Sequence, residues 1–362
     1  MRTSGAGPEP LTRIIALHFS GETRLTNMKK ILVPFLILAT TAFGQATSRA
    51  CKTCIAAHEH FLASDALQGR GSATANELLG AEYIAAQLEQ YGIKPGASTG
   101  YIQTVQADVD LAKLPLDKMP AQLSRGFKNA VQNGKLTTRN VIGVIPGSDP
   151  ILKKQVILLS AHMDHMGVVP EESLNGDDIF NGADDDASGV AAVLELARSL
   201  AGTKPKRTVM FVLFGSEELG GFGAKHFLAQ PPVPLTSIVA NLEFEMIGRP
   251  DAAIAPHTLW LTGFERSNLG PELAKHGARL VQDPHPEAKF FMRSDNYALA
   301  KLGVVAHTVS SFGLHKEYHR PNDDFAHLDL DHMTDAIGSM IEPVKWLVNS
   351  EFKPEWNAGQ KP

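Results

Sequence analysis

The sequence predicts an α/β fold, with a mixed and mostly parallel central sheet that is flanked by helices on both faces. Three mainly apolar runs, at residues 156–159, 208–214 and 237–244, are typical of strands that are buried on both faces of a parallel sheet. Apolar residues recur at helical spacing over 190–197 and again over 333–347. Strands that alternate with helices in this way define the α/β class.

Further elements are expected on either side of these segments. Residues 55–93 have the pattern of two helices that are divided by Gly69-Arg70-Gly71. A strand that ends in a turn is expected at 140–147. The remaining pattern predicts strands at 258–262 and 304–309 and helices at 267–276 and 294–301.

The N-terminal region has the features of an export signal. Met28-Lys29-Lys30 precedes an apolar stretch at 31–41, and small residues follow up to Gly44. We therefore expect translation to start at Met28 and the mature protein to be secreted or periplasmic, without a stable membrane span once the signal is removed. An uncleaved membrane anchor is the alternative.

The expected domain organisation is simple. Residues 1–44 form an upstream extension plus the signal peptide, 45–350 form one domain, and 351–362 form a C-terminal tail. Within the domain, residues 94–139 have a weak pattern with several prolines, which indicates a short insertion or lid. A chain of 362 residues is long enough for such a domain to bury a large core.

Charge and cysteine content exclude several classes of protein. The formal net charge is −5 and no basic cluster runs along the chain, so nucleic acid is not expected as a partner. The two cysteines, Cys51 and Cys54, can close into a small local disulfide in an exported protein. A redox motif would instead follow a strand in a βαβ unit, which this pair does not.

Residue types that bind metals follow each of the three apolar runs. The runs are followed in turn by His162 and Asp164, by Glu217 and Glu218, and by Glu243 or Glu245. Because the carboxyl ends of parallel strands meet at one edge of the sheet, these side chains are expected to lie together. Carboxylates gathered in this way repel one another unless a cation lies between them, and zinc accepts both imidazole and carboxylate ligands. We expect the loops at 184–186 and 315–319 to contribute to this site.

Five motifs in order resemble the co-catalytic dizinc aminopeptidases of peptidase family M28, over roughly residues 60–350. They are His162-Met163-Asp164, the segment 182–189 (GADDDASG), Glu217-Glu218, Met246-Ile247-Gly248 with an acid before it, and Tyr318-His319. The resemblance implies a zinc-exopeptidase-like fold and two Zn²⁺ ions per chain.

The resemblance also implies a role for each matching residue. Asp185 would bridge the two metals, His162 and Glu245 would complete one ion, and Glu218 and His319 would complete the other. Asp164 would hydrogen-bond the second nitrogen of His162, and Tyr318 would help to hold the oxyanion. Glu217 would be the general base for a metal-bridged water, and a cis peptide is expected after Asp185.

Several residues near the motifs have other interpretations. Most aminopeptidases of this type have Asp where this chain has Glu245, so Glu243 remains a reserve ligand. His165 is expected to be a residue of the second layer or a solvent-facing one, and Asp184 a solvated loop acid. His315 and His319 have the same spacing as the two histidines of the H-E-x-x-H helix in zincins. Pro321 follows where that helix would have to continue, so a zincin is not expected.

The resulting expectation is a secreted zinc aminopeptidase that acts on peptides. A carboxypeptidase or dipeptidase of the same fold would need an arginine cluster for the substrate carboxylate, and the arginines are scattered. A glutaminyl cyclase works with one zinc, and the full set of ligands argues against it. An inactive binding module should have lost Glu217 or a ligand, and none is lost.

Overall fold

The computed structural model describes residues 49–362 and contains one ten-stranded mixed sheet with the order β1-β4-β8-β5-β9-β12-β10-β11. The remaining strands of this sheet, β2 and β3, pair with β4. The strands are β1 (Lys94–Pro95), β2 (Ile102–Asp108), β3 (Val131–Gln132), β4 (Lys135–Ile145), β5 (Val156–His162), β8 (Thr208–Phe214), β9 (Ile238–Phe244), β10 (Leu259–Leu261), β11 (Leu280–Gln282) and β12 (Val305–Ser310). A separate two-stranded sheet joins β6 (Gly167–Val168) and β7 (Ile179–Phe180).

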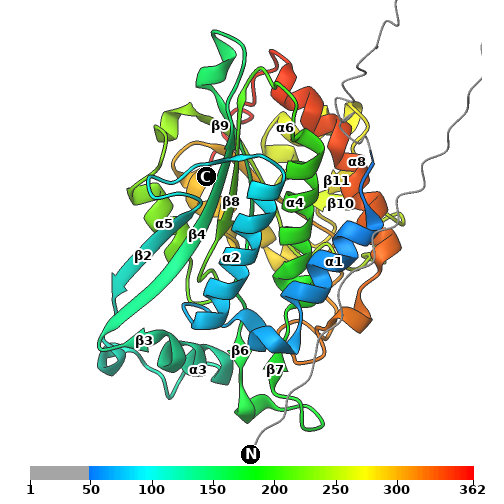
Figure 1. Ribbon diagram of the computed structural model, residues 1–362. Helices are drawn as coiled ribbons and strands as arrows, with labels where there is room; N and C mark the ends of the chain where they lie inside the picture. The colour runs from blue at the N-terminus through cyan, green and yellow to red at the C-terminus, as the bar shows by residue number, and fades with distance from the viewer. Residues whose placement is uncertain (1–48) are drawn as a thin grey trace, which may run out of the picture. The chain divides into compact units, whose positions relative to one another are not determined.

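Helices cover both faces of the sheet, as the sequence predicts. They are α1 (Lys52–Leu62), α2 (Ala75–Gln90), α3 (Ala121–Ala130), α4 (Gly189–Leu200), α5 (Phe222–Ala229), α6 (Leu269–Lys275), α7 (Asn296–Lys301) and α8 (Leu330–Asn349). One core joins α1, α2, α4, α6 and α8 to one face, and a second core joins α5 and α7 to the other. Figure 1 shows α1, α2 and α4 side by side over the first face.

The central strands explain this two-sided packing. Every residue of β5 is buried, with Ile157 and Leu159 in the first core and Val156 and Leu158 in the second. This alternation follows from the two-residue period of a strand. Strand β5 lies between β8 and β9 and is parallel to both, so the three strands end at the same edge.

The segment at 94–139 extends the sheet. Strand β2 pairs antiparallel with β4 over seven residues, from Ile102↔Val141 to Asp108↔Lys135. Helix α3 belongs to a small apolar cluster that also contains Leu219, which directly follows the Glu217-Glu218 pair. This segment therefore packs against the loop that carries two of the predicted site residues.

The N-terminal end of the described chain is fixed by a disulfide between Cys51 and Cys54, in agreement with their spacing. The predicted signal peptide at Met28 to Gly44 lies outside the described residues. Within residues 49–362, no helix has the length and apolar content needed to cross a membrane.

Candidate metal centre

The carboxyl ends of β5, β8 and β9 bring the predicted site residues together. His162 is the last residue of β5, Glu217 and Glu218 follow β8, and Glu245 follows β9. The loop that leads into α4 contributes Asp185, and the loop after β12 contributes His319. All of the metal-ligating residues that the sequence predicts therefore lie in one cluster.

Asp185 lies at the centre of this cluster. Its Oδ1 atom is 3.1 Å from Nε2 of His162, and its Oδ2 atom is 3.0 Å from Nε2 of His319. Ligand atoms of His162, Asp185 and Glu245 lie within 4.8 Å of one another, so this group could hold a metal ion and is called the first metal position. His319 Nε2 is also 3.3 Å from Oε1 of Glu218, and these two residues with Asp185 form a second candidate group, called the second metal position.

Several buried atoms in the cluster have no hydrogen-bond partner among the described residues. They are Oδ1 of Asp185, Oε1 of Glu218, Nε2 of His319 and both ring nitrogens of His165. A buried polar group that is left unpaired costs free energy, so such groups are rare unless an ion or water satisfies them. Imidazole and carboxylate atoms that converge at these distances fit zinc.

Burial and neighbouring charges shift the pKa values of these residues strongly. Burial raises the pKa of Glu217 well above its usual range. Burial is the largest influence on Glu218 and acts in the same direction, but His319 and His165 together lower the pKa of Glu218 to about 2. Burial alone would lower the pKa of His319, whereas Glu218 and Asp185 raise it to about 10. The carboxylates of Glu218 and Asp185 thus favour a cationic partner at this position.

Asp164 organises the loop that carries the two glutamates. Its carboxylate accepts hydrogen bonds from the backbone N–H groups of Glu217 at 3.0 Å and Glu218 at 3.3 Å, and from the Ser72 hydroxyl at 2.5 Å. The closest carboxylate oxygen is 3.8 Å from Nδ1 of His162, which is too long for a hydrogen bond. The backbone oxygen of Asp164 lies 3.2 Å from that nitrogen and takes the place that we expected for the side chain.

Two further aspartates hold the loop around Asp185. The peptide bond between Asp185 and Asp186 is cis. Asp323 accepts hydrogen bonds from the backbone N–H groups of Asp184 at 3.0 Å and Asp185 at 3.1 Å. Asp186 accepts from the backbone N–H groups of His162 and Met246, so it ties the ends of β5 and β9 to the loop.

Some residues near the site have burial and contacts that differ from those expected from the sequence. Asp184 is fully buried rather than solvated, because it accepts from the backbone N–H of Gly248 at 2.6 Å and pairs with His315 at 2.8 Å. His165 is not solvent-facing either, since it is fully buried against Glu218. Glu243 accepts a hydrogen bond from the backbone N–H of Asn296 and is absent from the groups of described residues that could hold a metal.

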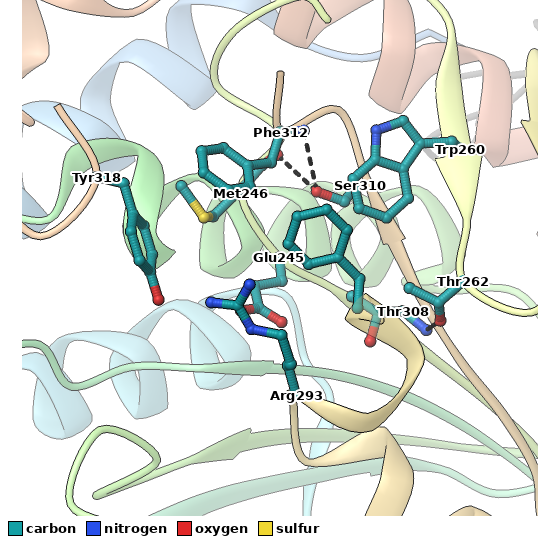
Figure 2. Close-up of a pocket in the computed structure, with 10 residues that line it drawn as sticks. Glu245, Met246, Trp260, Thr262, Arg293, Thr308, Ser310, Phe312 and Tyr318 are labelled. Atoms are coloured by element: carbon teal, nitrogen blue, oxygen red, sulfur yellow. Dashed lines mark hydrogen bonds between the residues drawn. The ribbon is translucent and has the colours of Figure 1, made fainter. Parts of the chain in front are cut away.

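A pocket opens beside the first metal position, with a cavity volume of about 70 Å³. Its lining consists of aromatic and apolar side chains with a few polar ones, namely Glu245, Met246, Trp260, Thr262, Phe290, Arg293, Thr308, Ser310, Phe312 and Tyr318. Figure 2 shows the Tyr318 hydroxyl and the Arg293 guanidinium turned toward the same end of the pocket as Glu245. Burial raises the pKa of Tyr318, and the carboxylates of Asp185 and Glu218 act in the same direction, so the phenol keeps its proton.

The fold and the cluster together define an α/β protein with a candidate metal centre at the carboxyl edge of its sheet. The chain matches the family model of peptidase family M28 over residues 140–342, and it belongs to that family.

The chain is similar in sequence to individual relatives over only part of their length. The chain is 33% identical over 152 residues to leupeptin-inactivating enzyme 1 of Streptomyces exfoliatus, which covers 40% of this chain and 30% of the relative. It is 23% identical over 228 residues to aminopeptidase YwaD of Bacillus subtilis, covering 60% of this chain and 47% of the relative. The chain thus spans between about a third and a half of these relatives.

Solved structures share the fold over most of the chain. An aminopeptidase from Aneurinibacillus sp. strain AM-1 aligns with a TM-score of 0.59 at 17% identity, covering 88% of this chain and 98% of that one. A glutaminyl cyclase of Porphyromonas gingivalis aligns with a TM-score of 0.58 at 18% identity, covering 83% and 100%. These likenesses establish the zinc-aminopeptidase type of fold.

Proposed function

We propose that this protein is a zinc-dependent aminopeptidase that binds two Zn²⁺ ions on either side of Asp185. The observation that carries the proposal is the approach of the His162 and His319 nitrogens to that buried carboxylate. Within the described residues, Oδ1 of Asp185 and Nε2 of His319 have no hydrogen-bond partner there. His162 and Glu245 would complete one position, and Glu218 and His319 the other. Bound zinc supplies a Lewis acid and lowers the pKa of a water ligand toward about 7.

Glu217 is the proposed general base. A ligand atom of its carboxylate lies within 4.8 Å of those of His162 and Glu218, so it faces the metal positions. Its raised pKa suits a carboxylate that must accept a proton near neutral pH. In the reaction Glu217 takes a proton from the attacking water and later donates it to the leaving amine.

Tyr318 is proposed to stabilise the negative charge that develops on the substrate oxygen. Its hydroxyl remains protonated because burial and the nearby carboxylates raise its pKa, so it can donate a hydrogen bond. Its ring stacks on His319 with the ring centroids 3.8 Å apart. This contact fixes the phenol beside the metal-ligating histidine.

The pocket beside Glu245 would receive the side chain of the N-terminal residue. Trp260, Phe290 and Phe312 form an aromatic wall, which favours a large apolar side chain. A pocket of this kind directly beside the proposed metal positions supports an exopeptidase that binds the terminal side chain next to the scissile bond.

A second candidate is a dipeptidase or carboxypeptidase, which Arg293 favours. This arginine lines the pocket and lies over the ring of Phe290, with its guanidinium carbon 5.1 Å from the ring centroid. In that position it could bind a substrate carboxylate. The binuclear ligand set would serve either reaction, so the second candidate is favoured only by this one guanidinium in the pocket lining.

The domain organisation and the destination of the protein are also part of the proposal. We propose that residues 45–350 form a single peptidase domain, with 94–139 as an insertion that packs on the Glu217-Glu218 loop. The segment Met28 to Gly44 would act as a signal peptide and direct the enzyme to the periplasm or the medium.

The test compares one short peptide with its amino terminus free and with it acetylated, using the zinc-loaded protein. We expect release of the N-terminal residue from the free form only. Release from the carboxyl end, or equal cleavage of both forms, would contradict the aminopeptidase assignment. The Glu217→Gln variant is the matched control for contaminating peptidases, because it should retain zinc without turnover.

A further inference from the structure

His165 occupies a fixed and fully buried place beside the second metal position. It lies three residues after His162, and its exposed fraction is 0%. Its backbone N–H donates to the carbonyl of Arg70 at 3.2 Å, and its carbonyl accepts from the N–H of Ser72 at 3.1 Å. The backbone of His165 is therefore held from both sides by the 70–72 segment.

The imidazole ring points into the acidic cluster. Its Nδ1 atom lies 2.9 Å from Oε1 of Glu218 and 4.0 Å from Oδ2 of Asp185. Its ring centroid is 5.6 Å from that of His319, which contacts the same two carboxylates. Two imidazoles thus approach the Glu218 and Asp185 oxygens.

The hydrogen bonding of His165 differs from that of other buried histidines. Within the described residues, neither ring nitrogen of His165 makes a hydrogen bond of acceptable geometry. In contrast, Nδ1 and Nε2 of His307 lie 2.7 Å from the Thr262 carbonyl and 2.7 Å from the Ser267 hydroxyl. A fully buried and unsatisfied imidazole that contacts two carboxylates has the surroundings of a metal ligand.

Gly182 makes room for this ring. It has a φ of +60°, and a Cβ atom at this position would lie 2.2 Å from the backbone oxygen of Asp185 and 2.5 Å from Cγ of His165. A side chain at residue 182 would therefore clash with both the Asp185 backbone and the imidazole.

We propose that His165 is a further zinc ligand, which joins Asp185, Glu218 and His319 at the second position. This inference rests on the proposed binuclear function. Donor atoms of a tetrahedral zinc site are about 3.3–3.6 Å apart, given metal–ligand distances near 2.0–2.2 Å. The spacings of 2.9, 3.0 and 3.3 Å among these donors approach those edges, while the 4.0 Å spacing is longer.

The additional imidazole would give the two metal positions different numbers of protein ligands. The second position would have four protein donors, whereas the first has three, namely His162, Asp185 and Glu245. Four protein ligands close a zinc site, while three leave a place for water or substrate. The second ion should therefore be the one that is retained longest against a chelator. A second imidazole also favours zinc over magnesium or calcium at this position.

The experiment measures zinc affinity by calorimetric titration of the metal-depleted full chain. The variants are His165→Ala and His165→Asn, with His226→Ala on α5 as the matched control for loss of one imidazole outside the cluster. We expect two zinc sites in the wild type and in the control. In both His165 variants, one site should weaken by roughly 10–100-fold or more while the other is unchanged.

The asparagine variant separates a ligand from a hydrogen-bond donor. Its amide can still donate to Glu218 but lacks the imidazole nitrogen, so restored affinity in His165→Asn would overturn the ligand assignment. Unchanged affinity in His165→Ala would overturn it as well. A wild type that binds no zinc would instead defeat the proposed function itself.

A spectroscopic measurement on the wild type avoids any dependence on variant folding. X-ray absorption at the zinc edge counts imidazoles through their outer-shell scattering. Three imidazoles shared by two zinc ions would support the proposal. Two imidazoles, from His162 and His319 alone, would contradict it.

Discussion

The carboxylate of Asp164, two residues beyond the end of β5, accepts a hydrogen bond of 3.0 Å from the backbone N–H of Glu217, the proposed general base. The same carboxylate accepts from the N–H of Glu218, a proposed metal ligand. One buried aspartate therefore positions both glutamates relative to His162.

Substitution of Asp164 by Asn should disturb both glutamates without removing any ligand. The amide would present a donor to one of the two backbone N–H groups, so the loop should shift. We expect kcat to fall about 10–100-fold, as for other residues that orient metal ligands. Ser72→Ala removes one hydrogen bond to Asp164 and should have a smaller effect. Full activity in Asp164→Asn would show that the loop does not depend on this anchor.

Glu217→Gln should separate proton transfer from metal binding. The amide cannot accept the proton, so kcat should fall by about 10²–10⁴-fold, while zinc content measured by mass spectrometry stays at the wild-type value. Glu218→Ala is the comparison, since it should lose metal as well as activity. Normal turnover by Glu217→Gln would require a different base.

The pocket should set the preference for the N-terminal residue. Phe312→Ala removes part of the aromatic wall, so kcat/KM for a substrate with N-terminal Leu or Phe should fall by about 10–200-fold. A substrate with N-terminal Ala should be affected less, because it does not reach that wall. Equal losses for both substrates would place the side chain elsewhere.

The free energy of unfolding should decrease in mild acid because of His307, which lies away from the metal cluster. Burial lowers the pKa of this residue from 6.5 to about 4. Below pH 6.5 the unfolded chain binds a proton that the folded chain does not, so the stabilising contribution is present above pH 6.5 and is lost as the pH falls toward 4. The full effect is about 3 kcal/mol.

Urea denaturation between pH 7 and pH 4.5 can detect this contribution. The wild type should lose free energy of unfolding on acidification. His307→Gln should be less stable at pH 7 but should show a shallower dependence on pH. Parallel pH profiles of the two proteins would exclude His307 as a source.

Most of the site could be predicted because its residues follow strands. The apolar runs that became β5, β8 and β9 also predicted that His162, Glu217, Glu218 and Glu245 would meet at one edge, since parallel strands end together. The loops at 184–186 and 315–319 were expected at the same site, and the family resemblance assigned Asp185 and His319 within them.

The other residues around the site, and the pairing of β2, depend on tertiary contacts that the local sequence does not encode. His165 is buried because the 70–72 segment packs on it from about 90 residues away. Asp323 reaches the N–H groups of Asp184 and Asp185 across a sequence separation of 138 residues or more. The segment at 94–139 had too weak a pattern to reveal that β2 would pair along β4, because edge pairing is a tertiary contact.

The most direct test of the central claim is anomalous X-ray diffraction at the zinc edge from crystals of the zinc-loaded protein. The account predicts two peaks on opposite sides of the Asp185 carboxylate, one beside His162 and Glu245 and the other beside Glu218 and His319. A single peak, or peaks away from Asp185, would contradict a binuclear centre bridged by this residue.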